Sequence, residues 1–315
     1  MGRHGLRCRH LMGRAAKRSA ELVEDMTLEE ILRIWQGLLR FSRDHRSVFI
    51  KARPRIQRQL PSMSIKQLIL VLRCARDLRR NMAELHGATC AMLLPHVAQL
   101  TPSEGAHCLS QCAYTDLYRA QVFSLVRAIA EDWTTREELS SQRLVEAVDA
   151  LECLASWNLR PVELLGRLDG LLVERQVELK YTGNVMLWVT ATCSLASLEY
   201  RPAAWPLLAL QLASDKIFLE QVPLYGHCEL LRGFLRLGLF EATAFQNFAE
   251  LLLAEKQHFR DVKDIAAVVT SFAQLRCLHS ELFDTLYKMT LDMSKARAGF
   301  SDMGIAPEIV PGFTP

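Results

Sequence analysis

Three short stretches decide the fold: Thr27-Leu-Glu-Glu30, Ser64-Ile-Lys-Gln67 and Thr101-Pro-Ser-Glu104. In each, a hydroxyl residue is followed three positions later by Glu or Gln, and apolar residues come next at helical spacing. This is the capping box, in which the hydroxyl accepts a backbone N–H of the first turn and the carboxylate or amide accepts the N–H of the cap. The stretches lie 37 residues apart, so the sequence predicts a repeat whose units begin with such a helix.

The same register continues along the chain with less regular cap residues. Further helix starts are expected at Ser140, Thr182, Val222 and Asp261, at spacings of 39, 42, 40 and 39 residues. A second amphipathic helix fits between the starts, at 118–133, 161–177, 203–222, 242–258 and 281–293. In the first unit the second helix is expected over 47–60, where Pro54 predicts a kink or a restart.

Two helices in every 37–42 residues predict an all-α protein, an α-solenoid of about seven two-helix repeats. The sequence has no sustained two-residue alternation bounded by hairpin turns, and it lacks the glycine-rich strand-to-helix turns of an α/β fold. The repeats are expected to fill 27–298, after a basic N-terminal arm or presequence remnant at 1–26. The segment 299–315 contains three Pro residues and is expected to be a tail that does not continue the last helix.

Composition favours a globular protein of a reducing compartment. Half of the residues are hydrophobic, which excludes a disordered protein. The nine cysteines include no Cys-x-x-Cys pair and lie among apolar residues, as reduced core thiols do. The longest stretch without Asp, Glu, Lys or Arg, 181–198, contains several Thr and Ser residues and predicts a buried helix rather than a membrane span.

The net charge of +3 conceals a strong asymmetry. Residues 1–80 carry 19 basic and 7 acidic side chains, whereas the rest of the chain carries 19 basic and 28 acidic ones. Such a basic end is typical of a region that faces a polyanion, and a targeting arm followed by solvated helix faces is the alternative. The first 20 residues contain six Arg or Lys and no acid, which indicates a mitochondrial presequence; a nucleic-acid-binding arm is the competing interpretation.

Two of the later repeats carry a resemblance to a known family. The stretches Phe234-Leu-Arg-Leu-Gly-Leu239 and Phe272-Ala-Gln-Leu-Arg-Cys-Leu278 each close a first helix, before a second helix opens with Glu241 or Glu281. They resemble the heptatricopeptide repeats of FAST-kinase-like and RAP-domain organellar proteins, and the resemblance covers most of 27–296. It implies a mitochondrial matrix protein that acts on organellar RNA, in some lineages as a subunit of the mitochondrial ribosome.

The resemblance does not extend to enzymatic activity. Nothing after Met293 resembles the C-terminal RAP domain, an α/β unit suspected of nuclease chemistry. The sequence also lacks the P-loop, dinucleotide-binding, nucleophile-elbow and zinc-protease motifs. We therefore predict a non-catalytic protein without a cofactor.

The expected RNA contacts lie in the N-terminal arm and in the first two units, over 27–80, where Arg outnumbers Lys. Arg donates in a planar fork that fits phosphates, whereas one or two cations at each helix end would only complement the helix dipole. The predicted RNA-binding residues are Arg43, Arg46, Lys51, Arg53, Arg55, Arg58, Lys66, Arg73, Arg76, Arg79 and Arg80. Isolated contacts are also considered at Arg119 and Arg127, and the acidic units after Ser140 are expected to bind protein.

Other constellations are interpreted as structural. Glu104/His107 and Glu255/His258 have the spacing of di-iron ligands, but Glu104 already serves a capping box. His107, Cys108 and Cys112 lack the fourth ligand that zinc normally takes, so no metal site is predicted. Of the five Trp residues at least four are expected in the core, and Trp133, beside two acids, is the candidate for base stacking.

The leading hypothesis is thus a mitochondrial RNA-binding repeat protein, a structural component of the mitochondrial ribosome or another ribonucleoprotein. The alternative is a protein-only scaffold, such as an accessory subunit of a mitochondrial membrane complex.

Overall fold

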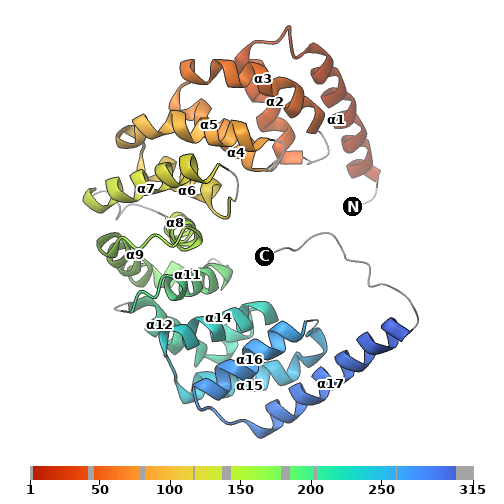
Figure 1. Ribbon diagram of the computed structural model, residues 1–315, viewed down its shortest axis with the longest axis vertical. Helices are drawn as coiled ribbons and strands as arrows, with labels where there is room; N and C mark the ends of the chain where they lie inside the picture. Colours follow the sequence, from red (N-terminus) through yellow and green to blue (C-terminus); the bar gives the residue numbers. More distant parts are fainter. Residues whose placement is uncertain are drawn as a thin grey trace. The chain divides into compact units, whose positions relative to one another are not determined.

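A computed structural model describes residues 3–41, 46–77, 82–115, 118–136, 143–178, 185–201, 204–259 and 261–302. Over these residues every regular element is a helix, which confirms the predicted all-α class (Figure 1). The chain divides into two compact units, Met1–Leu172 and Val173–Pro315. The sequence alone indicates one array over 27–298 and gives no sign of this division.

The helix starts expected from the sequence are confirmed. α2 (Leu28–Phe41), α4 (Ile65–Asp77) and α6 (Pro102–Cys112) follow directly after the three capping residues. Each cap N–H donates to the carboxylate or amide three residues on, at 2.7, 2.8 and 3.0 Å, and each cap hydroxyl accepts the N–H of that residue. The helices that begin within four residues of the other expected starts are α8 (Leu144–Ser156), α11 (Val185–Ser197), α14 (Leu224–Leu237) and α16 (Val262–Gln274).

The helices of the first unit form two rows. In one row α2, α4, α6 and α8 each contact the next. The second row, in which each helix again contacts the next, consists of α1 (Arg3–Leu22), α3 (Arg46–Gln59), α5 (Ala83–Leu93) and α7 (Arg119–Thr135). Helices of the two rows also pack in chain order, α2 on α3, α4 on α5 and α6 on α7. α9 (Val162–Glu174) ends this unit.

The second unit repeats this arrangement. Its first row is α11, α14 and α16, and each of these helices contacts the next. Its second row is α12 (Ala204–Ala213), α15 (Ala242–Ala254) and α17 (Ser280–Asp302), again packed in that order. The uncharged stretch 181–198 forms most of α11, where Trp188 and Leu195 are fully buried, as expected of a core helix.

Two predicted second helices differ from expectation. The helix expected over 203–222 ends at Ala213, and a short helix, α13 (Lys216–Leu219), follows it. The break occurs because the Asp215 carboxylate accepts the N–H groups of Ile217 and Phe218 and so starts a new helix. Conversely, α3 runs through Pro54 without a restart. Pro54 lies on the exposed side of α3, where water can hydrate the carbonyl that loses its partner.

The terminal segments also contain helix. Most of the predicted basic arm, 1–26, forms α1, which packs on α2 and α3 through the buried Ala16, Ala20 and Val23. At the other end α17 extends to Asp302, four residues into the predicted tail; the rest of that tail lies outside the described residues.

Side chains of the second row repeatedly bind the carbonyl groups at the end of the preceding helix. Arg55 of α3 donates to the carbonyls of Val23 and Glu24, just after α1, at 2.8 and 2.7 Å. In the second unit, Asn247 of α15 donates to the carbonyls of Ala213 and Ser214, at the end of α12, at 3.2 and 2.9 Å. Because the last carbonyls of a helix have no partner within it, these bonds satisfy groups that would otherwise be costly to bury.

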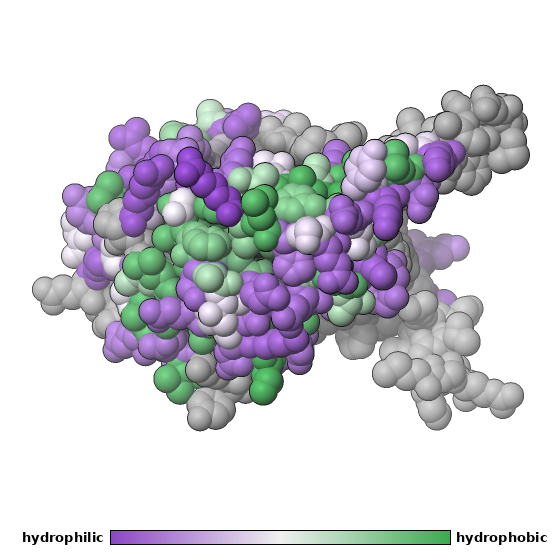
Figure 2. Space-filling view, turned by 90° about the horizontal axis from the view of Figure 1, so that it is seen from below, coloured by the Kyte–Doolittle hydropathy of each residue, from purple (hydrophilic) through white to green (hydrophobic). Residues whose placement is uncertain are grey.

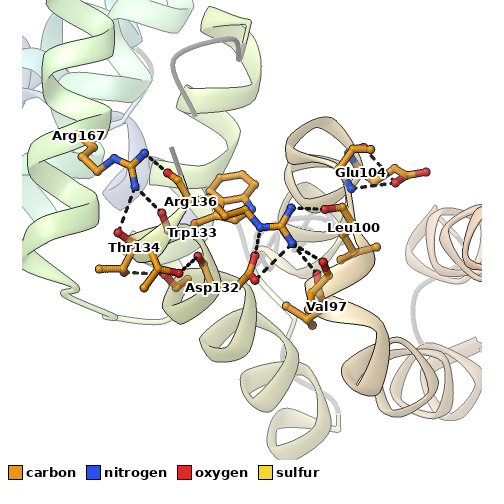
Figure 3. A network of polar contacts seen from close by, with 12 residues as sticks. Val97, Leu100, Glu104, Asp132, Trp133, Thr134, Arg136 and Arg167 are labelled. Carbon is orange, nitrogen blue, oxygen red and sulfur yellow. Dashed lines mark hydrogen bonds and ion pairs between the residues drawn. The ribbon is translucent and has the colours of Figure 1, made fainter. Parts of the chain in front are cut away.

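The same device occurs twice around α7 (Figure 3). Arg136 lies directly after α7. It donates to the carbonyls of three residues in and just after the helical turn η4 (Leu94–Gln99), which are Val97, Ala98 and Leu100. Its guanidinium also forms an ion pair with Asp132. Arg167 of α9 in turn donates to the carbonyls of Trp133, Thr134 and Arg136. Successive helix ends are therefore tied to the next helix of the row.

We predict that Arg167→Met lowers the free energy of unfolding by about 2 kcal/mol or more, because three carbonyls lose a charged donor. The matched control is Arg127→Met, which removes an exposed guanidinium from the same row and costs less than about 1 kcal/mol. Chemical denaturation of the full chain measures both. Equal losses in the two variants would contradict a structural role for Arg167.

Two glycines provide a second test of the packing. A Cβ on Gly105 in α6 would lie 2.8 Å from the Trp133 ring, whereas one on Gly170 in α9 meets nothing within 4 Å. We expect Gly105→Ala to destabilise the protein by about 1–3 kcal/mol through overpacking. Gly170→Ala should stabilise it by up to about 1 kcal/mol through helix propensity. Thermal unfolding followed by circular dichroism checks the sign of each change.

Candidate nucleic-acid interface

The strongest positive region of the described chain is formed by α3 and α4. Between Asp44 and Asp77 the sequence contains no carboxylate and eight Arg or Lys residues. The structure assigns these basic residues to different rows of the first unit, because α3 lies between α1 and α5 and α4 lies between α2 and α6. The predicted basic set is therefore not one continuous patch.

On α3 the basic residues have unequal roles. Lys51 and Arg58 are exposed, seven residues apart and so on one side of the helix, and Arg58 also donates to the carbonyl of Pro54 at 3.3 Å. Arg55 is engaged with the carbonyls at the end of α1, and Arg53 is half-buried with an interaction of its own. Lys51 and Arg58 are thus the residues of α3 best placed to meet a phosphate.

α1 adds to the positive charge of this row. Arg14, Lys17 and Arg18 are exposed, although Arg18 is paired with Glu21 at 3.1 Å. The predicted RNA-binding residues do not include these three, and the signal for them is the absence of any acid before Glu21. The α1–α3 surface, defined by Arg14, Lys17, Lys51 and Arg58, carries more exposed basic residues than α4 does.

On α4, Lys66 and Arg73 are exposed and seven residues apart, so they share one side of that helix. Arg76 is half-buried, and its charge acts on two buried thiols. The pKa of Cys112 is nevertheless raised by the hydrogen bond with Cys90 and by burial, and that of Cys153 is raised mainly by burial. Arg43, Arg79 and Arg80 lie outside the described residues, as does the side chain of Arg46.

Arg119 and Arg127, the isolated RNA contacts considered beyond the first two units, both interact with other groups of the protein. Arg119 is exposed but lies over the ring of Trp157, 5.7 Å from its centroid. Arg127 pairs with Glu131 at 2.7 Å. Neither interaction prevents phosphate binding, since exposed ion pairs are weak. Both guanidinium groups nevertheless already have a partner within the protein, which the sequence alone does not indicate.

The prediction that Trp133 could stack on a base is wrong. Trp133 is buried, packs on Gly105 and cannot meet a base. Four tryptophans lie in the core, the number expected, but Trp133 is one of them, together with Trp35, Trp188 and Trp205. The half-exposed indole is that of Trp157, whose Nε1 donates to the Cys112 carbonyl at 2.9 Å. The acids beside Trp133 indicate exposure in the sequence, yet they lie on the other sides of α7.

The two Glu-x-x-His pairs and the His107/Cys108/Cys112 group are interpreted from the sequence as structural, and the structure shows their surroundings. Glu104 accepts the N–H of Thr101, which confirms its capping role, and His107 is exposed with Nδ1 2.7 Å from the Ser103 carbonyl. Glu255 and His258 lie at the end of α15 and in the turn η6 (Lys256–His258), where His258 is exposed. Cys112 is buried and is brought together with His86 and Cys90 rather than with His107.

An apolar groove of about 450 Å³ lies between α16 and α17 in the second unit. Figure 2 shows hydrophobic side chains gathered on the face that carries α17. The groove is lined by Val262, Ile265, Val269, Phe283, Leu286 and Tyr287. Exposed Tyr287 and Leu291 extend the apolar surface along α17. Such a surface suits a hydrophobic protein segment and offers nothing to a phosphate.

The chain matches no protein-family model, and a comparison with curated proteins gives no significant match. Among the described residues, no helix combines the length and the apolar character needed to cross a membrane.

We predict different roles for two neighbouring cations of α3. Arg55→Ala should lower the free energy of unfolding by about 1–3 kcal/mol, because the carbonyls of Val23 and Glu24 lose their donor. Lys51→Ala should change it by less than about 0.5 kcal/mol, since Lys51 is exposed. Urea denaturation separates the two outcomes. If Lys51→Ala were the more destabilising substitution, the assignment of roles would be reversed.

Proposed function

We propose that this protein is a non-catalytic RNA-binding α-solenoid of the heptatricopeptide type. In this proposal it acts in the mitochondrial matrix as a structural component of the mitochondrial ribosome or another organellar ribonucleoprotein. RNA is bound by the basic first unit, and proteins are bound by the second unit.

The observation that carries the proposal is the α1–α3 surface. Its exposed Arg and Lys residues lie on two helices that contact each other, and α3 contains no carboxylate that would repel a phosphate. Arg and Lys bound to phosphates release counterions, which provides most of the affinity of sequence-independent binding. Because the residues that define this surface are all Arg or Lys, we expect contacts to the RNA backbone to dominate.

The repeat assignment is supported by recurrence within each unit. Helix starts recur at 37–42 residues, helices of one row contact the next, and polar side chains bind the end of the preceding helix at several levels. An array in which each helix pair covers its neighbour has these features.

The alternative function is a protein-only scaffold, and the groove between α16 and α17 is the observation that favours it. An open apolar surface of this kind marks a site for another protein. Both functions can reside in one chain, because a ribonucleoprotein component binds RNA and protein through separate surfaces.

Two charge-reversal variants test the RNA surface. We expect Lys51→Glu with Arg58→Glu to weaken binding of single-stranded RNA by about tenfold or more at low salt. The slope of log affinity against log salt should become shallower by about 0.7 for each phosphate that the variant no longer binds. The matched control is Lys66→Glu with Arg73→Glu, which makes the same change in charge on the other row. Fluorescence anisotropy at several salt concentrations measures both.

The control should lose much less affinity than the first variant. Equal losses would mean that the two rows bind RNA alike, which contradicts the α1–α3 assignment. If wild-type protein bound RNA no better than the first variant, RNA binding itself would be rejected in favour of the scaffold.

A further inference from the structure

A buried cluster of metal-binding side chains lies in the first unit, away from the basic surface. His86 and Cys90 occupy successive turns of α5, and Cys112 is the last residue of α6. One nitrogen of the imidazole and the two thiol sulfurs lie within 4.8 Å of one another, and all three residues are buried. We propose that His86, Cys90 and Cys112 form a zinc-binding site.

The distances fit a zinc ion with little rearrangement. With Zn–S bonds of about 2.3 Å and Zn–N bonds of about 2.0 Å, tetrahedral geometry places nitrogen and sulfur about 3.6 Å apart and two sulfurs about 3.8 Å apart. In the structure, Nδ1 of His86 and Sγ of Cys90 are 3.9 Å apart. Zinc bound by these three side chains would take a water molecule as its fourth ligand, as it does in other sites with three protein ligands.

The imidazole is oriented in the way that metal ligands require. Nε2 of His86 lies 3.1 Å from the carbonyl oxygen of Gln111, to which it donates in the tautomer that leaves Nδ1 unprotonated. Nδ1 then carries a lone pair and lies 3.9 Å from Sγ of Cys90. Metal-ligating histidines almost always donate their other N–H to such an acceptor. The neutral ring is the form that binds a metal.

The position of Cys112 is fixed as well. Its carbonyl accepts the indole N–H of Trp157 at 2.9 Å, and this bond connects the end of α6 with the end of α8. Gly87, beside His86, lets the Tyr118 side chain approach so closely that a Cβ there would lie 2.7 Å from it. The backbone is thus held on both sides of the cluster.

The charges of the three ligands themselves suit a divalent cation bound by thiolates, while Arg76 adds a positive charge near His86 and Cys112. A thiol loses its proton when it binds a metal. Zn²⁺ would displace one proton from each thiol, and two thiolates with a neutral imidazole balance its two positive charges. Thiolates and imidazole together select zinc or copper(I) over magnesium and calcium.

The proposal concerns a stabilising metal between neighbouring helix pairs. α5 belongs to the pair that begins with α4, and α6 begins the next pair, so a shared ion would tie the two pairs together. It is independent of RNA binding, because His86, Cys90 and Cys112 are buried and the α1–α3 surface is not.

The first test uses the wild-type full chain and needs no variant. Protein purified under reducing conditions from zinc-supplemented cells should contain about one zinc ion per chain by elemental mass spectrometry, because the three groups converge on one point. Cobalt(II) added to metal-depleted protein should produce the absorption of cobalt bound to thiolates. Wild-type protein that neither retains zinc nor shows this absorption would overturn the proposal, and stoichiometric copper(I) in place of zinc would overturn the choice of metal.

The second test identifies the ligands. Cys90→Ser and Cys112→Ser should each lose the bound zinc, whereas the control Cys228→Ser, at a buried cysteine in the second unit, should keep it. A chelator should lower the melting temperature of wild type and of Cys228→Ser and leave that of Cys90→Ser unchanged. Full zinc content in correctly folded Cys90→Ser and Cys112→Ser would show that the metal lies elsewhere and would overturn the assignment.

Discussion

Every α-helix ends in carbonyl groups that have no partner within the helix, and a stack of helices buries many of these ends. At four helix ends of this protein the partner is a side chain that follows later in the sequence. Arg55, Arg136, Arg167 and Asn247 all donate to carbonyls at the end of the preceding helix. Apolar packing holds neighbouring helices together, but it is not directional. These hydrogen bonds fix the position of a helix along its axis relative to the preceding helix.

Because some guanidinium groups bind helix carbonyls, not every positive charge in the sequence is available to a polyanion. A guanidinium directed at helix carbonyls is committed to the fold, and Arg55 belongs to this class although it lies in the most basic stretch of the sequence. Lys51 and Arg58, on the same helix, remain exposed. The number of arginines therefore overstates the surface available to a polyanion, and the division into two rows reduces it further.

The sequence-based predictions are accurate where the deciding interactions join residues that are close in the sequence. The capping boxes at Thr27, Ser64 and Thr101 are complete within four residues, so the helix starts can be predicted closely. The break at Asp215 is missed because its single cap competes with a continuous apolar pattern. Burial of Trp133 and the convergence of His86 with Cys112 depend on which helices become neighbours, and no local pattern reports that. The sequence signal that points toward the cluster is His86 and Cys90 one turn apart on an apolar helix.

The direction of the carbonyl bonds has a consequence for protein synthesis. Each donor follows its acceptor in the chain, by 31 residues for Arg55 and Glu24, by 38 for Arg136 and Ala98, and by 34 for Arg167 and Trp133. As the chain leaves a translating ribosome, the end of every such helix is exposed before its donor has been made. At each of these helix ends, the next stretch of about one repeat length therefore both extends the fold and supplies the donor for the helix made before it.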